Sequence, residues 1–309
     1  MNKIAIALHG GAGTILKKHI TPAKEAAYKK ALKHALDVGY ASLEQNKSAV
    51  EAVELSIIEM ENSPLFNAGK GSVFTNKGTH EMDASIMEGK TLHAGAAALV
   101  HNIKNPVSLA RLIMEKSEHV MLAGEGAMEF AKKMKCKFEP DRYFYNEFRY
   151  QQWIEIKDSE IVQLDHSVNK KKGTTGAVAL DVYGNLAAGT STGGVTNKKT
   201  GRIGDSPIIG SGTYANNKSC AISCTGNGEF FIRSVAAYDI SCLMEYKGMS
   251  LDDACHEVIN NKLLKLGGEG GLVGIDANGN IVVCFNSEGM YRAYKQPGKS
   301  AVTAIYKEY

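Results

Sequence analysis

The chain changes character at the stretch Gly173-Thr174-Thr175-Gly176-Ala177-Val178-Ala179-Leu180-Asp181. A polar, lysine-rich segment ends just before it, and an apolar run typical of a buried strand follows Thr174. Most Gly-Thr pairs at such a junction are ordinary loop ends. Here, however, a hydroxyl lies at the entrance of a strand, directly after a glycine whose missing Cβ lets another group approach its carbonyl closely. Thr174 is therefore either a plain strand-entry residue or a nucleophile.

Breaking the bond between Gly173 and Thr174 would give Thr174 a free α-amino group. Such a group has a reference pKa of about 7.7–8.0, which suits a general base near neutral pH. A threonine activated by its own N-terminal amine is a known type of nucleophile. The stretch therefore raises the hypothesis of a protein that cuts itself before Thr174.

The hydrophobic fraction of 44% and the charged fraction of 22% are ordinary for a globular protein with a sizeable core. We expect one domain over residues 1–309, because no Pro/Ser-rich linker divides the chain. The net charge is only +3, and short lysine runs such as Lys198-Lys199 are expected on solvated faces or loops, which argues against nucleic-acid binding. No apolar run approaches membrane length, and residues 4–8 are too short for a signal peptide. The six cysteines contain no Cys-x-x-Cys pair, so neither a zinc site nor a disulfide framework is expected. We therefore expect a cytoplasmic protein with reduced thiols and no membrane partner.

Helical and strand patterns occur in separate blocks. Thr21-Pro22 is an N-cap followed by proline at the first helical position, and it predicts a helix to about Glu44. Ser48 and Glu51 form a capping box for a second helix. Further helices are expected at 106–116, 124–134 and 231–246 and from 250 onward, and strands at 3–8, 81–87, 94–100, 175–180, 185–190 and 219–224. Two hairpins are expected at the end of the chain, one over 271–285 around Asn278-Gly279 and one that pairs 290–294 with 301–306, and the segment 135–172 is polar and less regular. These blocks predict an α+β layered fold.

Polar residues gather in glycine-flanked loops, namely Asn67, Thr174, Thr192, Arg202, Asp205, Thr225 and Gly226. Each has a plain structural interpretation. Threonines between glycines commonly end strands, and Arg202 with Asp205 could form a surface ion pair, which contributes little to stability. His9, which begins a glycine-rich loop, is likewise expected to be a hydrogen-bonded structural histidine rather than a catalytic one. Together, however, the loop residues match a complete catalytic set.

Six motifs are spread over nearly the whole chain: His9-Gly10-Gly11-Ala12-Gly13, Pro64-Leu65-Phe66-Asn67-Ala68-Gly69, Gly173-Thr174-x-Gly176-Ala177-Val178-Ala179, Thr190-Ser191-Thr192-Gly193-Gly194, Gly201-Arg202-x-Gly204-Asp205-Ser206-Pro207 and Ser223-Cys224-Thr225-Gly226. Jointly and in register, they resemble the plant-type L-asparaginase and isoaspartyl peptidase family of N-terminal nucleophile (Ntn) hydrolases. The resemblance implies a four-layer αββα sandwich, in which two mostly antiparallel sheets lie between helix layers. It also implies self-cleavage into an α subunit, 1–173, whose last part, about 155–173, is a flexible linker, and a β subunit, 174–309, assembled as (αβ)2.

The resemblance implies a chemical role for each loop residue. Thr174 Oγ would attack the side-chain amide of L-asparagine or the β-linked carbonyl of a β-aspartyl dipeptide, and Thr192 would hydrogen-bond this nucleophile. The Thr225 hydroxyl and the Gly226 N–H would form the oxyanion hole, and Asn67 would be an orienting amide. Substrate binding would fall to Arg202, which suits an α-carboxylate, and to Asp205 and the Gly228 carbonyl, which would hold the α-ammonium, together with Thr225 and Gly226.

The resemblance also implies a structural sodium ion and no organic cofactor. The sodium would be held mainly by backbone carbonyls of residues 60–70, those of Met60, Glu61, Ser63, Phe66, Ala68 and Lys70. Two positions depart from the family pattern. Thr175 stands where an aliphatic residue is common, and Lys70 stands where the family often has an apolar residue, a change that a backbone-mediated site tolerates.

Three other functions are weighed beside the amidohydrolase. Two are close relatives, a glycosylasparaginase and a threonine endopeptidase that cuts proteins after aspartate; the lack of an early secretory segment argues against the first. The third is a catalytically silent binding module, which is disfavoured because every expected catalytic position is filled. The sequence leaves the ratio of asparaginase to dipeptidase activity open, because the pocket loops decide which leaving group fits.

Overall fold

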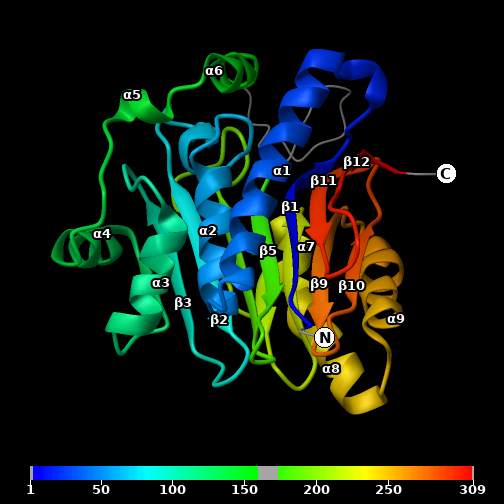
Figure 1. Cartoon of the computed structure of the whole chain (residues 1–309). Coiled ribbons are helices and arrows are strands. Elements are labelled where there is room, and N and C mark those ends of the chain that lie inside the picture. Colours follow the sequence, from blue (N-terminus) through cyan, green and yellow to red (C-terminus); the bar gives the residue numbers. More distant parts are fainter. Residues whose placement is uncertain (1–2, 159–172, 308–309) are drawn as a thin grey trace.

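The larger of two sheets forms the centre of the protein. The structure is a computed structural model that describes residues 3–158 and 173–307. Its larger sheet has the strand order β12-β11-β1-β5-β6-β2-β3-β4 and is antiparallel except where β3 pairs with β4 (Figure 1). The strands are β1 (Ala5–Gly13), β2 (Met82–Glu88), β3 (Ala94–Val100), β4 (Met121–Ala123), β5 (Thr175–Leu180), β6 (Leu186–Thr192), β11 (Gly289–Lys295) and β12 (Val302–Tyr306).

A smaller, fully antiparallel sheet packs against the larger one. Its order is β10-β9-β8-β7, with β7 (Thr213–Ala215), β8 (Cys220–Gly226), β9 (Gly270–Asp276) and β10 (Ile281–Phe285). Alternation along β5 shows how the layers meet, because successive side chains of a strand point to opposite faces. Val178 and Leu180 join the apolar cluster that includes Ile222 and Leu272 of the smaller sheet, whereas Ala177 and Ala179 face the helices of the N-terminal half.

Helices cover the outer face of each sheet. The outer face of the larger sheet carries α1 (Pro22–Glu44), α2 (Ala49–Glu61) and α3 (Pro106–Lys116), and that of the smaller sheet carries α8 (Ala236–Lys247), α9 (Leu251–His256) and the π-helical turn η3 (Glu257–Leu263) (Figure 1). The remaining helices are α4 (Gly124–Lys133), α5 (Asp141–Phe144), α6 (Glu147–Ile154), α7 (Gly228–Ser234) and the 3-10 turns η1 (Lys17–His19) and η2 (Gly69–Gly71). The order helix, sheet, sheet, helix confirms the predicted four-layer αββα sandwich. Within the described ranges, no helix has both the length and the apolar character needed to cross a bilayer.

The predicted caps are present. The Thr21 hydroxyl accepts the Lys24 N–H at 3.2 Å, and the Ser48 hydroxyl accepts the Glu51 N–H at 3.2 Å. The single helix expected at 231–246 is wrong, because Val235 adopts a left-handed φ of 49° and separates α7 from α8. A left-handed β-branched residue is strained, so a propensity argument does not foresee it.

The segment 135–158 is more regular than expected, since it contains α5 and α6. Asn146 caps α6 by accepting the Arg149 N–H at 3.3 Å, and Trp153 of this helix stacks on Phe74 with ring centroids 5.8 Å apart. These tertiary contacts order a stretch whose polar composition suggested irregular chain. Of the linker predicted at about 155–173, residues 155–158 form a turn after α6, and residues 159–172 lie outside the described ranges.

Candidate active site

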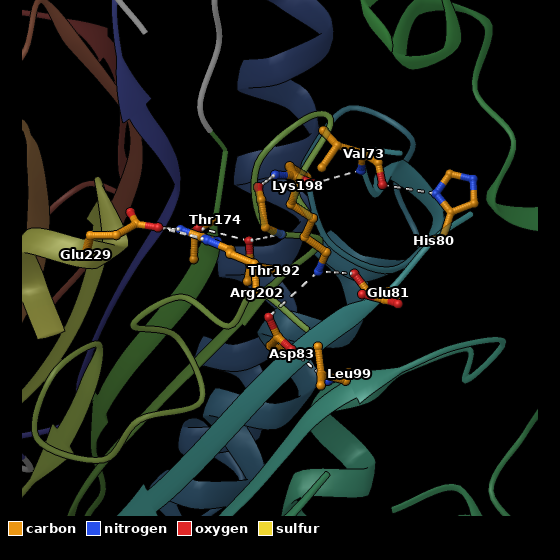
Figure 2. Close-up of polar contacts among 12 residues, drawn as sticks. Val73, His80, Glu81, Asp83, Leu99, Thr174, Thr192, Lys198, Arg202 and Glu229 are labelled. Atoms are coloured by element: carbon orange, nitrogen blue, oxygen red, sulfur yellow. Dashed lines mark hydrogen bonds and ion pairs between the residues drawn. The ribbon is translucent and has the colours of Figure 1, made fainter. Parts of the chain in front are cut away.

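Thr174 lies at the entrance of β5, between β1 and β6 in the middle of the larger sheet. Its hydroxyl donates to Thr192 Oγ1 at 3.1 Å, and Thr192 Oγ1 also accepts the Gly194 N–H at 3.0 Å (Figure 2). Thr175 is fully buried and donates to the Ser191 carbonyl oxygen at 3.2 Å. Of the two adjacent threonines, therefore, the half-buried Thr174 has the hydroxyl that meets Thr192.

His9 holds the backbone of Thr174. The imidazole is fully buried, with Nδ1 3.0 Å from the Thr174 carbonyl oxygen and Nε2 2.9 Å from Ser223 Oγ. Burial lowers the pKa of His9 to about 3, so the ring is neutral at physiological pH. Because a carbonyl only accepts, Nδ1 carries the proton and Nε2 accepts from the Ser223 hydroxyl. These contacts confirm the structural histidine expected from the sequence.

Gly176 makes this arrangement sterically possible. A Cβ at this position would lie 1.9 Å from Ser223 Oγ and 2.6 Å from His9 Nε2. Behind Ser223, a row of buried hydroxyls continues to Thr190 Oγ1 at 2.7 Å and from there to Thr213 Oγ1 at 2.6 Å. Sequence reasoning missed this network, since its members come from β6, β7 and β8 and have no shared spacing in the chain.

Asn67 packs between the glycine before the nucleophile and the turn after Thr192. Its side-chain N–H donates to the Gly194 carbonyl at 2.7 Å, and its Oδ1 accepts the Val73 N–H at 3.0 Å. A Cβ on Gly173 would lie 3.2 Å from Asn67 Cβ, and a Cβ on Gly193 would lie 2.6 Å from Asn67 Oδ1. The structure thus brings Asn67 beside Gly173 and the Gly193-Gly194 turn, as an orienting amide requires.

Arg202 pairs with a residue that the sequence did not single out. Its Nε donates to Glu229 Oε1 at 3.0 Å, and its Nη2 lies 2.9 Å from the same oxygen (Figure 2). The surface ion pair of Arg202 with Asp205, one of the interpretations left open above, is not formed, because Asp205 is buried. Glu229 lies 27 residues after Arg202, beyond the range of a spacing argument, although it directly follows Gly228.

Asp205 is a buried carboxylate with an unused oxygen. It is 4% exposed, and its Oδ2 has no hydrogen-bond partner in the described part of the chain. A Cβ on Gly228 would lie 2.8 Å from Asp205 Oδ1, which places that glycine against the carboxylate. Burial raises the pKa of Asp205 to about 7, opposed by the charge of Arg202. An unpaired buried carboxylate is unfavourable, so Asp205 is suited to pairing with a cationic group.

The predicted oxyanion residues come from the smaller sheet. Thr225 and Ser223 are two residues apart on β8 and so share a face. Ser223 contacts His9, and Thr225 Oγ1 accepts the Ala12 N–H at 3.3 Å, so both meet β1 of the larger sheet. Gly226 ends β8 with φ 156°, where a Cβ would lie 2.4 Å from the Glu269 carbonyl oxygen. The site is therefore assembled where the two sheets face each other.

In the loop predicted to hold sodium, two glycines lie close against backbone carbonyls. A Cβ on Gly69 would lie 2.4 Å from the Glu61 carbonyl oxygen, and one on Gly71 would lie 2.0 Å from that of Phe66. The Glu61 side chain is engaged elsewhere, accepting from the Ser191 hydroxyl at 2.6 Å and the Val107 N–H at 3.0 Å. In the described ranges, no group of three or more His, Cys, Asp or Glu side chains could hold a metal. A cation in this loop would therefore have backbone oxygens, such as those of Glu61 and Phe66, as its ligands.

Two facing sheets between helix layers, with a threonine at the start of a central strand, define the class of Ntn hydrolases. Within this class the chain belongs to the Asparaginase family, whose model matches residues 2–305. It is 50% identical to an isoaspartyl peptidase of Salmonella typhimurium, over 100% of both chains, and 50% identical to an isoaspartyl peptidase of Escherichia coli, over 100% of this chain and 98% of that one. It is 42% identical to a plant-type L-asparaginase of Pyrococcus horikoshii, over 96% of this chain and 97% of that one. The protein is an amidohydrolase of this family.

Proposed function

We propose that the chain hydrolyses the side-chain amide of L-asparagine and the β-linked bond of β-aspartyl dipeptides, after cutting itself between Gly173 and Thr174. The observation that carries this proposal is the Thr174 hydroxyl, which donates to Thr192 Oγ1 at 3.1 Å at the entrance of a central strand. The names of the relatives, isoaspartyl peptidase and plant-type L-asparaginase, support both substrate classes.

Self-cleavage uses the same hydroxyl as hydrolysis. Thr174 Oγ attacks the Gly173 carbonyl carbon, the peptide C–N bond breaks, and the resulting ester is opened by water. The products are residues 1–173 and 174–309, with a free α-amino group on Thr174. Mass spectrometry and N-terminal sequencing of the purified protein test this step. We expect the smaller fragment to begin Thr-Thr-Gly-Ala, whereas a start at Thr175 would exclude Thr174 as the nucleophile.

Hydrolysis then follows from the freed amine. The α-amino group of Thr174 takes the proton from its own Oγ, which attacks the substrate carbonyl. The Thr225 hydroxyl and the Gly226 N–H stabilise the negative charge that develops on the carbonyl oxygen. Ammonia or an amino acid leaves with the proton, and water releases aspartate from the acyl-enzyme. Thr192 and Asn67 orient the groups that react.

Two charged groups of the substrate, the α-carboxylate and the α-ammonium, are recognised by side chains of opposite charge. The planar fork of Arg202 suits the α-carboxylate. The unused oxygen of Asp205, together with the Gly228 carbonyl, suits the α-ammonium. Assays for ammonia from L-asparagine and for free leucine from β-Asp-Leu test the activity. Release of aspartate from glycosylated asparagine instead, or cleavage of proteins after aspartate, would favour the two alternative hydrolases, and no product at all would favour a binding module.

We further propose an (αβ)2 assembly in the cytoplasm, with a structural sodium ion held by the carbonyls of residues 60–70 and no organic cofactor. Light scattering coupled to gel filtration measures the assembly, and cell fractionation the location. Replacing sodium by tetramethylammonium, which is too large for a carbonyl cage, should lower the melting temperature. An unchanged melting temperature would contradict the sodium site.

A further inference from the structure

Lys198 is a buried lysine next to the proposed substrate site, although the sequence suggested a solvated loop for Lys198-Lys199. Its side chain is 0% exposed, and Nζ donates to the Glu81 carbonyl oxygen at 2.9 Å. Nζ also lies 4.0 Å from Asp83 Oδ2, and the Asp83 side chain is 0% exposed as well. A buried ion pair is generally no more stabilising than well-packed apolar side chains of the same volume. Stability alone therefore does not explain a lysine at this place.

Both members of the pair Asp83–Lys198 lie next to parts of the proposed active site. Asp83 on β2 is the register partner of Thr192 on β6, whose hydroxyl meets Thr174. The aliphatic part of the Lys198 side chain packs against the turn that follows Thr192. A Cβ added to Gly194 in this turn would lie 2.9 Å from Lys198 Cδ and 3.4 Å from Arg202 Nη1. Figure 2 shows the Lys198 ammonium reaching both Glu81 and Asp83. The lysine stem and the arginine fork thus share one small space.

The charges around this space act on one another. Asp83 attracts the Lys198 ammonium, whereas Arg202 repels it. The negative charge of Asp83 also contributes to raising the pKa of Asp205, the carboxylate proposed to receive the substrate ammonium. In the described ranges, Asp83 Oδ2 accepts no hydrogen bond, so the Lys198 ammonium is the charge that balances it. Without that ammonium, Asp83 would be an uncompensated buried anion, and the Arg202 guanidinium, which acts on the same lysine, would be a cation free to answer it.

We propose that Lys198 is a positioning residue for substrate recognition: by neutralising the charge of Asp83, it keeps the Arg202 guanidinium available to the substrate α-carboxylate. This inference rests on the proposed function. It predicts an asymmetry between the two members of the pair. Losing the lysine charge exposes Arg202 to Asp83, whereas losing the aspartate charge leaves Arg202 without a competing anion.

The experiment compares Lys198→Met, Asp83→Asn and the double variant Asp83→Asn/Lys198→Met in the processed protein. The readouts are KM and kcat for β-Asp-Leu and the Kd of L-aspartate by calorimetry, the latter without turnover. For Lys198→Met we expect KM and Kd to rise about tenfold, as for the loss of one charge-assisted hydrogen bond, with little change in kcat. The double variant, which leaves no unpaired buried charge, should stay within about threefold of the wild type. Asp83→Asn should do so as well, because burial already lowers the pKa of Lys198 and its amine can lose the proton once the aspartate charge is gone. The exposed neighbour provides the matched control Lys199→Met, which should change nothing.

Unchanged KM and Kd in folded Lys198→Met would overturn the proposal. A double variant as weak in binding as Lys198→Met would also overturn it, because the loss would then come from packing of the lysine stem and not from charge. If Lys198→Met does not fold, the double variant decides, since it carries no unpaired charge: near-native KM supports the proposal and a tenfold rise contradicts it. A wild type that hydrolyses neither substrate refutes the proposed function instead, and L-aspartate binding still reports on Lys198.

Discussion

The imidazole of His9 on β1 donates from Nδ1 to the carbonyl oxygen of Thr174 at 3.0 Å, and this contact joins the first strand of the chain to the proposed nucleophile. The bond fixes the peptide plane that follows Thr174. With the backbone fixed, the β-branched side chain has few rotamers, which holds Oγ toward Thr192. The glycine-rich start of the chain therefore acts on the site through backbone geometry and not through proton transfer.

Replacing His9 by phenylalanine should destabilise the uncut chain. The substitution keeps the ring volume roughly but removes the donor to the Thr174 carbonyl, at a cost of about 1–3 kcal/mol, whereas the Ser223 hydroxyl keeps its contacts with Thr190 and with the Gly189 carbonyl. Urea denaturation in a Thr174→Ala background, which keeps the chain in one piece, measures the loss. The exposed His34 offers a control, since His34→Gln should change the free energy of unfolding by less than about 0.5 kcal/mol. Equal stability of the two variants would show that the His9 contacts contribute nothing.

Thr174→Ala should abolish both self-cleavage and hydrolysis, because alanine has no oxygen to attack with. Thr174→Ser should retain part of each, since serine keeps the oxygen but loses the rotamer restriction. Gel electrophoresis reports the cleavage, and ammonia release reports the hydrolysis. The matched control is Thr175→Ser, at the neighbouring threonine whose hydroxyl bonds to the Ser191 carbonyl. Fragments of normal size from Thr174→Ala would refute the mechanism.

Local signals in the sequence were sufficient for much of the fold. Thr21 and Ser48 start their helices as expected, because a cap depends on residues only three positions away. The hairpin between β5 and β6 forms around 181–184 for a similar reason. Val235 was not foreseen, because its left-handed conformation runs against the preference of a β-branched residue.

Site residues that belong to a sequence motif were predictable. Ion pairs between segments that are distant in the sequence were not. Thr174 and Thr192 lie together as their motifs implied. Glu229 and Lys198 escaped notice, the first because its partner is 27 residues away and the second because a lysine pair in a polar loop is normally solvated. The burial of Lys198 depends on Asp83, which is distant in sequence and close only after β2 has paired with β6.

Arg202→Lys should lower kcat/KM for β-Asp-Leu by about tenfold or more while leaving self-cleavage largely intact. Each charge-assisted hydrogen bond contributes roughly 1.5–3 kcal/mol, and the lysine point charge cannot reproduce the planar fork. The precursor bond needs no free carboxylate, so processing should proceed. Arg233→Lys, on an exposed position of α7, is the matched control. An unchanged kcat/KM would assign Arg202 to a structural pair with Glu229 and place the carboxylate clamp elsewhere.

Binding of L-aspartate should release protons near neutral pH, because of Asp205. Burial raises the pKa of this carboxyl to about 7, so in the free protein roughly half of it is protonated at that pH. An α-ammonium favours the charged carboxylate and lowers its pKa, so affinity should increase as pH rises from 6 to 8. Glu61, whose pKa burial also raises to about 7, should not respond, because Ser191 and Val107 already occupy its carboxylate.

Calorimetry of the processed protein in two buffers of different ionisation enthalpy counts these protons. Release should be about half a proton at pH 7, approach one proton as the pH falls toward 6, and vanish near pH 8.5, where Asp205 is already charged. Asp205→Asn, titrated at higher ligand concentration, should lose this release, which separates it from any proton that the Thr174 amine exchanges. Binding with no proton release at pH 7, or with the same release in Asp205→Asn, would mean that the ammonium of the ligand lies elsewhere. In that case the unused oxygen of Asp205 would take no part in binding, and recognition of the amino-acid end of the substrate would rest on Arg202 alone.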